Sequence, residues 1–422
     1  MPLARPLSEA LAGDDVTRLL GGLCQKTKFG QHLAIRNWYS TPEFAEPTGR
    51  ALDLLAQQKD QAIPEKTRAA LADPQKWLFL DTETTGLAGG TGTYAFLVGI
   101  AWWDAGGLEV EQLFMRDFAD EHSVLYELAE RITERPVLVT FNGKTFDWPL
   151  LESRFTMTRR IAPPKLAAHL DLLHPSRALW KLRLGSVRLI ELEQQVLDAE
   201  RLGWRRADDV ASALIPQLYF DYLRGGSAMP LASVVRHNQM DLRGLAALFG
   251  KINLMLAEEE PGETDGRDLF GLSRFLYRRG EAPRAAKVCA RAMEAGLPAE
   301  HRRQAMRELA LMAKRRGDYL EAAKLWEGLL NGSQHAIEAC EQLAIHHERR
   351  EKDFQRAMEY ARLGLDKLRS GAQRLSDPYA EARIARQEKS LLHRVARLRQ
   401  RITNAVPERR KRGLAEERGR LL

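Results

Sequence analysis

Residues 76–92, KWLFLDTETTGLAGGTG, join an apolar run to two acidic residues and a glycine-rich segment. The apolar run from Trp77 to Leu80 predicts a buried strand that places Asp81 and Glu83 at its carboxyl end. Side chains two residues apart on a strand point to the same face, so the two carboxylates are expected to converge. Carboxylates that close need a cation between them or a shared proton, and a divalent metal meets that need. A solvated strand end is the alternative interpretation for the pair taken alone.

The composition is that of a globular protein. The 422 residues are 44% hydrophobic and 29% charged, enough for two or three domains with a sizeable core. The longest apolar run, Tyr94 to Trp103, is far shorter than the roughly 20 residues that span a bilayer, and the amino-terminal stretch lacks the apolar segment of a signal peptide. The cysteines are widely spaced and offer neither a disulfide framework nor zinc-ligand spacing: Cys24, Cys289 and Cys340. We therefore expect a cytoplasmic protein without membrane contact.

The net charge of +7 is unevenly distributed. Residues 394–422 contain ten Lys or Arg against three Glu, so this segment alone has an excess equal to that of the whole chain. A basic tail of this kind attracts phosphate backbones without sequence preference. A solvated terminus is equally common for such a composition, and the sequence leaves the two alternatives open.

Residues 1–75 form a lead-in that we expect to pack on the following domain. Its patterns predict helices at 14–23 and 67–71 and a strand at 29–38.

Residues 76–257 show the pattern of an α/β domain. Three strands in succession with glycine-rich links predict an antiparallel meander, at 77–81, 94–103 and 108–115. Further strands alternate with helices, which is typical of parallel additions to the same sheet; the strands are at 137–141 and 169–173, and the helices at 120–133 and after Phe146. Helical periodicity closes the domain at 186–196 and 228–256. The predicted fold class is therefore α/β, a mixed sheet flanked by helices.

The glycine run AGGTGT at 88–93 has two interpretations. Glycines after a strand can cradle a phosphate, but the lysine of the phosphate-binding loop pattern is missing, since Tyr94 follows Thr93. A tight hairpin turn is the interpretation that we favour.

The pattern becomes continuously helical after a linker rich in Glu, Gly and Pro at 258–268. Within residues 269–402 three segments align: RFLYRRGEAPRAAKV from Arg274, LALMAKRRGDYLEAAKL from Leu309 and LAIHHERREKDFQRAMEY from Leu343. Their matching residues Glu281, Asp318 and Asp353 are 37 and 35 residues apart. A period near 34 built from paired helices is the tetratricopeptide pattern, and such stacks present a concave surface to a partner. A plain helical bundle that only stabilises the first domain is the alternative. Residues 403–422 complete the basic tail.

Two later segments carry further acidic residues. In FNGKTFDWPLL, residues 141–151, a helix begins near Asp147, which could be a cap residue and nothing more. In HNQMD, His237 and Asp241 are four residues apart on one face of a helix, where a surface hydrogen bond would also explain them. The acidic residues of the three segments occur in the order Asp81, Glu83, Asp147 and Asp241.

The three motifs DTETTGL, FNGKTFDWPLL and HNQMD resemble those of the DEDD superfamily of 3'-5' exonucleases, which have the ribonuclease H-like fold. The middle motif is especially similar to the proofreading domains of family B DNA polymerases. The whole block, with DTETTGLAGGTGTYAFLVG, HLDLLHPSR and HNQMD in order, resembles the bacterial YprB-like group of ribonuclease H-like proteins, which often carry tetratricopeptide repeats behind the nuclease domain. The resemblance covers residues 25–256 and identifies the predicted sheet as ribonuclease H-like.

The resemblance implies hydrolysis of phosphodiester bonds with two divalent cations, Mg²⁺ or Mn²⁺, about 4 Å apart. Oxygen-rich carboxylate ligands select these ions over zinc. Asp81 would bridge the ions, with the cage completed by Glu83, Asp147 and Asp241. His237 would accept the proton of the attacking water. The family places a histidine base five residues before the last aspartate and a tyrosine four before it, so His237 occupies the tyrosine register and its role as base is a separate hypothesis.

Other residues beside the motifs are predicted to contact the substrate. The turn after the first strand would hold the terminal nucleotide, or it simply ends the strand: Thr84, Thr85, Gly86 and Leu87. Three side chains near the second motif would meet phosphate or stack on a base: Asn142, Lys144 and Trp148. Asp171 either orients a ligand or forms an ion pair with Arg177.

The sequence thus predicts a cytoplasmic, metal-dependent hydrolase, a 3'-5' exonuclease that acts on single-stranded DNA or RNA. The helical repeats would recruit a protein partner or guide the substrate strand. A non-catalytic adaptor is the alternative, in which the nuclease-like fold is a platform and the repeats bind protein partners or nucleic acid. No reader of the 2'-hydroxyl can be identified from spacing, so DNA and RNA are not distinguished.

Overall fold

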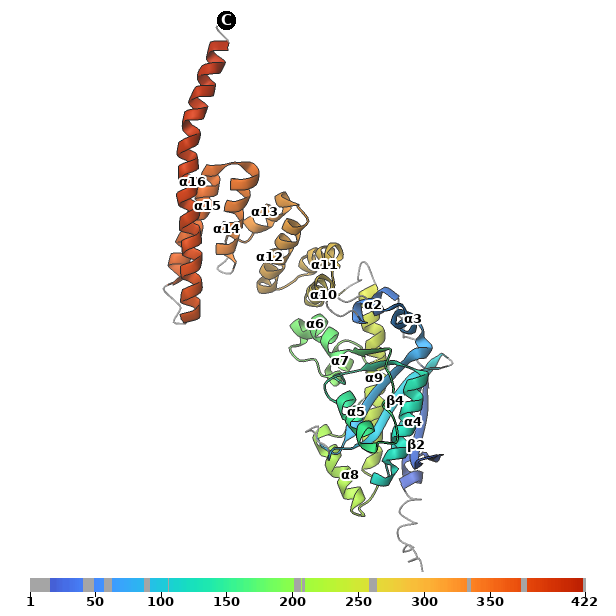
Figure 1. Cartoon of the computed structure of the whole chain (residues 1–422). Helices are drawn as coiled ribbons and strands as arrows, with labels where there is room; N and C mark the ends of the chain where they lie inside the picture. Colours follow the sequence, from blue (N-terminus) through green and yellow to red (C-terminus); the bar gives the residue numbers. More distant parts are fainter. Residues whose placement is uncertain are drawn as a thin grey trace, which may run out of the picture. The chain divides into compact units, whose positions relative to one another are not determined.

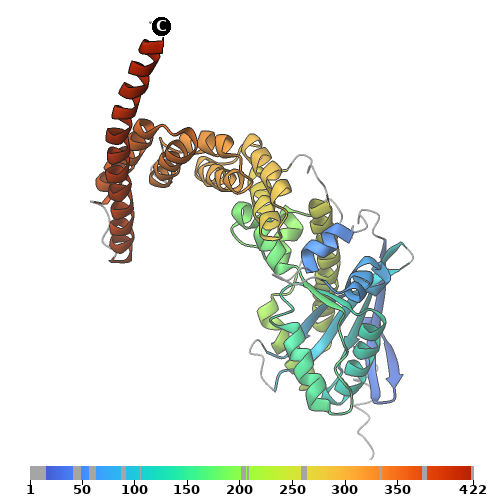
Figure 2. The same cartoon turned by 45° about the horizontal axis from the view of Figure 1, so that its top comes forward.

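The computed structural model divides into two compact units, residues 1–263 with 274–281 and residues 264–273 with 282–422. The structure describes residues 16–40, 49–56, 63–86, 92–104, 106–200, 206, 209–257, 264–331, 335–372 and 378–419. Among these residues, the first unit contains a sheet packed against helices, and the second consists of helices (Figures 1 and 2). No helix among them is both long enough and apolar enough to cross a membrane.

The first unit is built on a seven-stranded mixed sheet with the strand order β1-β2-β5-β4-β3-β6-β7. The first five strands in this order are antiparallel neighbours, and β6 and β7 continue the sheet parallel to β3. The predicted meander and its two parallel additions are therefore confirmed. The strands are β1 Leu23–Thr27, β2 Gly30–Ser40, β3 Trp77–Thr84, β4 Ala95–Asp104, β5 Gly107–Phe114, β6 Val137–Thr140 and β7 Ala168–Asp171.

The lead-in supplies the outer part of this sheet. β2, which corresponds to the strand predicted at 29–38, pairs with β5 from Leu33 opposite Phe114 to Ser40 opposite Gly107. The helix predicted at 14–23 is described from residue 16 and ends at residue 20, and β1 follows as the edge strand. The pattern analysis missed β1 because its sequence LCQKT is mostly exposed and lacks the apolar alternation that indicates a strand.

Helices of the first unit agree with the prediction where the apolar period is clear. The helices expected at 120–133, after Phe146 and at 228–256 correspond to α4, α5 and α9. The hairpin predicted at 88–93 lies largely outside the described residues, although the strands that it joins, β3 and β4, are antiparallel neighbours. The helices are α2 Gly49–Ala56, α3 Glu65–Ala72, α4 Glu121–Glu134, α5 Asp147–Thr158, α6 Leu173–Leu184, α7 Leu189–Gln195, α8 Ile215–Leu223 and α9 Leu231–Ala257.

Side chains along β3 alternate between two layers of helices. Trp77 and Phe79 contact Phe249 of α9 edge to face, with ring centroids 5.2 and 5.6 Å apart. The leucines between and after them point to the opposite side, into a core shared with α4 and α5. Asp81 and Glu83 continue the row of Trp77 and Phe79, so the strand directs both carboxylates toward α9.

From residue 264 onward the described chain is a succession of paired helices (Figure 1). Each of the three aligned segments crosses from one helix of a pair to the next, and the turn contains a residue with positive φ: Gly280 at 85°, Gly317 at 87° and Lys352 at 57°. Asp318 and Asp353 then accept hydrogen bonds from backbone N–H groups three residues ahead, which caps the second helix of the pair. This architecture is consistent with the predicted tetratricopeptide repeats, whose identity stays a prediction.

Two predicted boundaries of the second unit differ from the helices observed. Part of the linker predicted at 258–268 lies outside the described residues, and α10 already begins at Gly266. The last helix continues past residue 402, where we expected the basic tail to begin. The elements are α10 Gly266–Arg278, α11 Ala282–Glu294, α12 Ala299–Arg315, α13 Tyr319–Glu327, α14 Ala336–His346, the π-helical turn η4 His347–Glu351, α15 Phe354–Ala372 and α16 Pro378–Gly419.

Candidate metal centre

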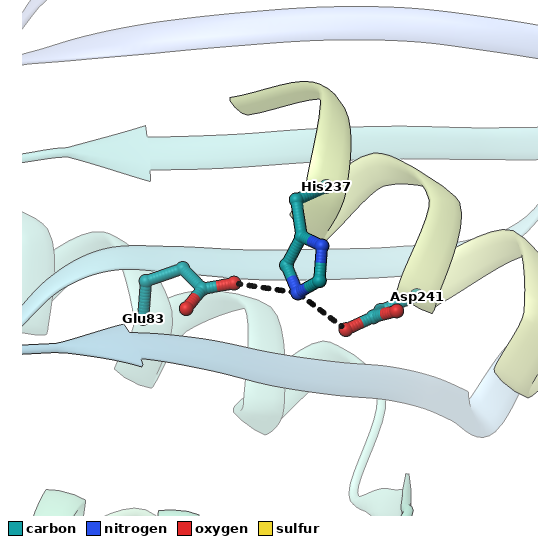
Figure 3. A group of neighbouring side chains, drawn as sticks. All are labelled: Glu83, His237 and Asp241. Carbon is teal, nitrogen blue, oxygen red and sulfur yellow. Dashed lines mark ion pairs between the residues drawn. The ribbon is translucent and has the colours of Figure 1, made fainter. Parts of the chain in front are cut away.

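Glu83 of β3 faces His237 and Asp241 of α9 (Figure 3). Nε2 of His237 lies 4.0 Å from Oε1 of Glu83 and 3.5 Å from Oδ2 of Asp241. One ligand atom from each of the three residues lies within 4.8 Å of the other two. The spacing of four residues puts His237 and Asp241 on one face of α9, as predicted, and long-range packing against β3 adds Glu83.

Asp81 is held in this cluster by a chain of amides. Its Oδ2 accepts a 2.8 Å hydrogen bond from Nδ2 of Asn238, whose own Oδ1 accepts a 2.8 Å hydrogen bond from Nε2 of Gln112 on β5. Asn238 and Gln112 are fully buried. Gly99, opposite Asp81 on β4, makes room for Asn238, because a Cβ at this position would collide with the amide. The orientation of Asp81 is therefore fixed by groups on three separate elements.

Asp147 joins the cluster from the start of α5. Its Oδ1 accepts a hydrogen bond of 2.6 Å from Oγ1 of Thr82, the residue between Asp81 and Glu83. The Asp147 carboxylate is near enough to both acidic side chains to raise their pKa values. The N-cap position of α5 belongs to Phe146, so capping does not account for Asp147.

A second layer of charge comes from Arg206, which the sequence analysis missed. The guanidinium binds Glu193 of α7 through two hydrogen bonds of 2.7 and 2.6 Å, Asp209 at 3.1 Å and Asp241. Gly244 of α9 leaves the space that Glu193 occupies, since a Cβ there would overlap its carboxylate. Arg206 thereby ties Asp241 to a buried glutamate.

Asp209 determines how His237 presents its ring. Oδ1 of Asp209 and Nδ1 of His237 are 2.8 Å apart. Burial alone would raise the pKa of Asp209, but the hydrogen bonds to His237 and Arg206 hold it below its ordinary value. An ionised carboxylate can only accept, so Nδ1 carries the hydrogen and Nε2 of a neutral ring directs a lone pair toward Glu83 and Asp241.

The acidic side chains of the cluster repel one another. Burial, followed by repulsion from Asp241 and the other carboxylates, raises the pKa values of Asp81 and Glu83 well above their ordinary range. Burial also raises the pKa of Asp147, against the hydrogen bond from Thr82. A divalent cation would relieve this repulsion, and the oxygen-rich donor set fits Mg²⁺ or Mn²⁺. The residues present therefore fit the predicted ions.

The turn after β3 uses its own polar groups. Oγ1 of Thr84 donates to the carbonyl of Gly86 at 2.9 Å, and Oγ1 of Thr85 accepts from the backbone N–H of Tyr94 at 2.9 Å. Thr84, Thr85 and Gly86 are half-buried, while Leu87, also predicted to hold the substrate, lies outside the described residues. Both hydroxyls are therefore already engaged in hydrogen bonds with the backbone of nearby residues.

Asp171 of β7 fixes the loop that leads from β6 into α5. Its carboxylate accepts backbone hydrogen bonds from Asn142 at 2.8 Å, Lys144 at 3.1 Å and Leu173 at 3.0 Å. Asn142 has a φ of 68°, in a region that asparagine tolerates better than most residues. In the described part of the chain these N–H groups, and not Arg177, are the hydrogen-bond partners of Asp171. Asp171 therefore stabilises the loop through its backbone N–H groups.

The side chains predicted beside this loop differ in exposure. Lys144 is exposed, Asn142 is half-buried, and half-buried Trp148 packs edge to face on His169 with ring centroids 6.3 Å apart. The contact with His169 gives Trp148 a structural role in addition to the predicted one.

Comparison with known proteins identifies the family. Residues 78–253, which include every member of the cluster named above, match the family model of the ribonuclease H superfamily. Over 331 residues the chain is 31% identical to the uncharacterized protein YprB of Bacillus subtilis (strain 168), and this alignment covers 77% of the chain and 75% of that protein. The superfamily match suggests a nuclease that acts on nucleic acid with divalent metals. The chain belongs to the YprB family, and residues 78–253 are its ribonuclease H superfamily domain.

Proposed function

We propose that this chain is a divalent-metal-dependent 3'-5' exonuclease that hydrolyses single-stranded DNA or RNA in the cytoplasm. The observation that carries the proposal is the convergence of Glu83, His237 and Asp241 within 4.8 Å, beside the carboxylates of Asp81 and Asp147, which repel their acidic neighbours. These residues come from three elements that are far apart in the sequence. A shared structural role does not require so many repelling carboxylates in one buried place, whereas a cation site does.

The carboxylates of Asp81, Glu83, Asp147 and Asp241 would hold two ions, Mg²⁺ or Mn²⁺. When bound, such ions activate water and stabilise the charge that develops on the leaving oxygen. Asp81 is directed toward the cluster by Asn238 at 2.8 Å. A fixed carboxylate loses little freedom when it binds, so this hydrogen bond favours a defined metal geometry.

His237 would accept the proton of the attacking water through Nε2. The hydrogen bond to Asp209 fixes the ring orientation and stabilises the imidazolium that forms after proton transfer. Asp209 would thus support a histidine that occupies the register of a tyrosine in related exonucleases. Nε2 lies 3.5 Å from Asp241, which places the base beside the proposed metal ligands.

The 3'-5' polarity rests on the resemblance of the three motifs to those of DEDD exonucleases. In this proposal the turn after β3, with Thr84, Thr85, Gly86 and Leu87, meets the terminal nucleotide. A phosphate or a base would be contacted by Asn142, Lys144 and Trp148. These residues lie in or just after the loop that Asp171 supports, which leads to Asp147.

The test is digestion of single-stranded DNA and RNA carrying a label at either the 5' or the 3' end. With Mn²⁺ or Mg²⁺ the wild type should shorten 5'-labelled strands progressively and release a 3' label at once. Asp81→Asn, which keeps the side-chain shape, should be inactive because it removes a metal-binding charge. Glu152→Gln, the same kind of change at an exposed position of α5, should retain full activity.

Three outcomes would contradict parts of this proposal. Equal degradation by wild type and Asp81→Asn would remove the site assignment. A ladder that shortens from the 5' end would contradict the polarity but leave the metal site intact. Failure to cleave any strand, together with metal-independent binding of a protein partner, would favour the adaptor alternative.

A further inference from the structure

A pocket of about 470 Å³ lies between successive helices of the second unit. Its walls come from α12, α13, α14 and η4, which follow one another along the chain (Figure 1). The buried, apolar part of the lining, called the floor below, includes Ala322, Ala323 and Trp326. Its volume is in the range of sites that bind small molecules or single nucleotides, and is too small for a nucleic-acid duplex.

The rim of this pocket has charge of one sign. Four cationic side chains contribute to the lining, and no Asp or Glu does: Lys314, Arg315, Arg349 and Arg350. Glu351 lies 3.4 Å from His346 and does not itself line the pocket. The pocket therefore combines an apolar interior with a positive edge.

Two of these cations, Lys314 and Arg350, are oriented by uncharged groups. Nζ of Lys314 donates a 2.7 Å hydrogen bond to the uncharged amide of Gln342. The guanidinium of Arg350 stacks on Tyr319, with Cζ 3.7 Å from the ring centroid. Arg349 is exposed beside Arg350 on η4. Neither of the groups that orient Lys314 and Arg350 is a carboxylate, and a positive charge held in this way is suited to an anion from outside the chain.

The charge of the surrounding sequence points to a polyanion. Residues 264–422 contain 35 Lys or Arg and 22 Asp or Glu, an excess of 13, although the whole chain has an excess of only 7. Residues 1–263 are accordingly acidic overall. A positive region attracts polyanions from a distance, whereas at physiological salt the cations in direct contact determine the affinity.

We propose that this pocket binds a segment of single-stranded nucleic acid, with phosphates on Lys314, Arg349 and Arg350 and a base over the apolar floor beside Tyr319. Single-strand sites in general combine cations that follow the backbone with apolar or aromatic surfaces for the bases. The pocket is a binding site separate from the candidate metal centre. The proposal concerns binding alone and does not depend on hydrolysis in the first unit.

The experiment measures binding of a fluorescein-labelled oligothymidylate of about twenty nucleotides to the full chain by fluorescence anisotropy. EDTA is present throughout, so that no strand is cleaved. The triple variant Lys314→Gln, Arg349→Gln, Arg350→Gln should bind at least about tenfold more weakly, and the slope of log K against log salt should fall by about 2, because each lost phosphate contact on a single strand removes about 0.7.

The matched control removes three exposed cations of the same unit that do not line the pocket: Lys287→Gln, Arg362→Gln and Lys389→Gln. The control should bind within about twofold of wild type at physiological salt, where exposed charges beyond roughly 8 Å are screened. An equal loss in both triple variants would show that only the overall charge matters and would overturn the pocket. If circular dichroism shows that the pocket variant is unfolded, Arg349→Gln is compared with Arg362→Gln in the same way.

A polyglutamate peptide of equal charge is the competitor, and it distinguishes nucleic acid from acidic protein as the ligand of the pocket. Nucleic-acid binding predicts that polyglutamate displaces the oligothymidylate only at much higher charge concentration, since it offers no base for the apolar floor. Displacement at equal charge concentration would assign the pocket to acidic proteins and overturn the proposal. Loss of nuclease activity in the first unit would leave this result unchanged.

Discussion

Two glutamates with little exposed side chain, Glu83 and Glu348, are in opposite electrostatic surroundings. In the first unit the Glu83 side chain is 12% exposed and faces Asp241, and burial and repulsion raise its pKa well above the ordinary value. In the second unit the Glu348 side chain is 3% exposed and binds Arg394 and Arg397 at 2.7 and 2.8 Å. Burial would raise the pKa of Glu348 too, but the arginines hold it below its ordinary value. The surroundings of Glu83 therefore retain a charge imbalance that a ligand can correct, whereas the charge of Glu348 is neutralised by arginines of the protein.

The largest effect is expected from Glu83→Gln, which should abolish hydrolysis and weaken Mn²⁺ binding in titration calorimetry. The same change should raise the melting temperature of the metal-free protein near pH 7.5, because it removes a buried charge that the neighbouring carboxylates repel. Loss of activity with gain of stability is the usual relation at a strained functional site. A variant that loses stability without metal would show that Glu83 is a structural residue.

Glu348→Gln is the opposite test in the second unit. It should lower the free energy of unfolding by about 2 kcal/mol, less than the roughly 3–5 kcal/mol for a fully buried pair, since Arg397 and Arg401 are partly hydrated. Chemical denaturation measures the change, and hydrolysis should persist. A stability equal to wild type would mean that the arginines do not hold α16 through this carboxylate.

Asp209→Asn sharpens the comparison within the first unit, because hydrogen bonds to His237 and Arg206 hold the pKa of Asp209 below its ordinary value although burial would raise it. It should reduce kcat about 10–100-fold, the usual cost of removing a group that orients an active residue. The apparent affinity for Mn²⁺ should change little, since Asp209 acts through His237. Asp221→Asn, an exposed change on α8, is the control. A large fall in Mn²⁺ affinity would instead make Asp209 a ligand.

The pH dependence of stability should differ with and without metal. A carboxyl group whose pKa is raised in the folded protein keeps its proton at pH values where the unfolded chain, with a pKa of about 4, has lost it. The unfolding free energy therefore falls as the pH rises from about 4 toward the folded pKa. Asp81 and Glu83 should give this trend in metal-free protein. Glu348 has the reverse sign, and its contribution is lost as pH falls through its lowered pKa.

Scanning calorimetry in EDTA and in saturating Mn²⁺ checks this expectation. The increase in melting temperature on adding Mn²⁺ should be larger at pH about 7.5 than at about 5, because protons compete with the metal for the same carboxylates. An increase independent of pH would contradict the role of the raised pKa values.

The parts of the fold that could be predicted from sequence have strong local patterns. The buried strand before Asp81, the glycine-rich links of the meander and the period of α9 all depend on residues close together in the chain. β1 was missed because an exposed edge strand has no such pattern. In the third of the aligned helical segments Lys352 takes the positive φ that Gly280 and Gly317 have in the other two, which weakens the repeat signal there.

The candidate site was predicted in part. The motifs gave four carboxylates and His237, but not the groups that orient them. Arg206 and Asp209 lie in a stretch without periodicity. Their partners Asp241 and His237 are about 30 residues further along the sequence, so only the folded structure shows these contacts. In the sequence Gln112 is an ordinary polar residue of a strand, and its role follows only from the contact with Asn238 of α9. Supporting residues of this kind leave no local signal, because their role depends on the assembled fold.

The most direct measurement is anomalous X-ray diffraction from crystals grown or soaked with Mn²⁺. The account predicts manganese peaks bounded by the carboxylates of Asp81, Glu83, Asp147 and Asp241, and none at this place in Asp81→Asn. Wild-type crystals saturated with Mn²⁺ that show no peak among these side chains would contradict it.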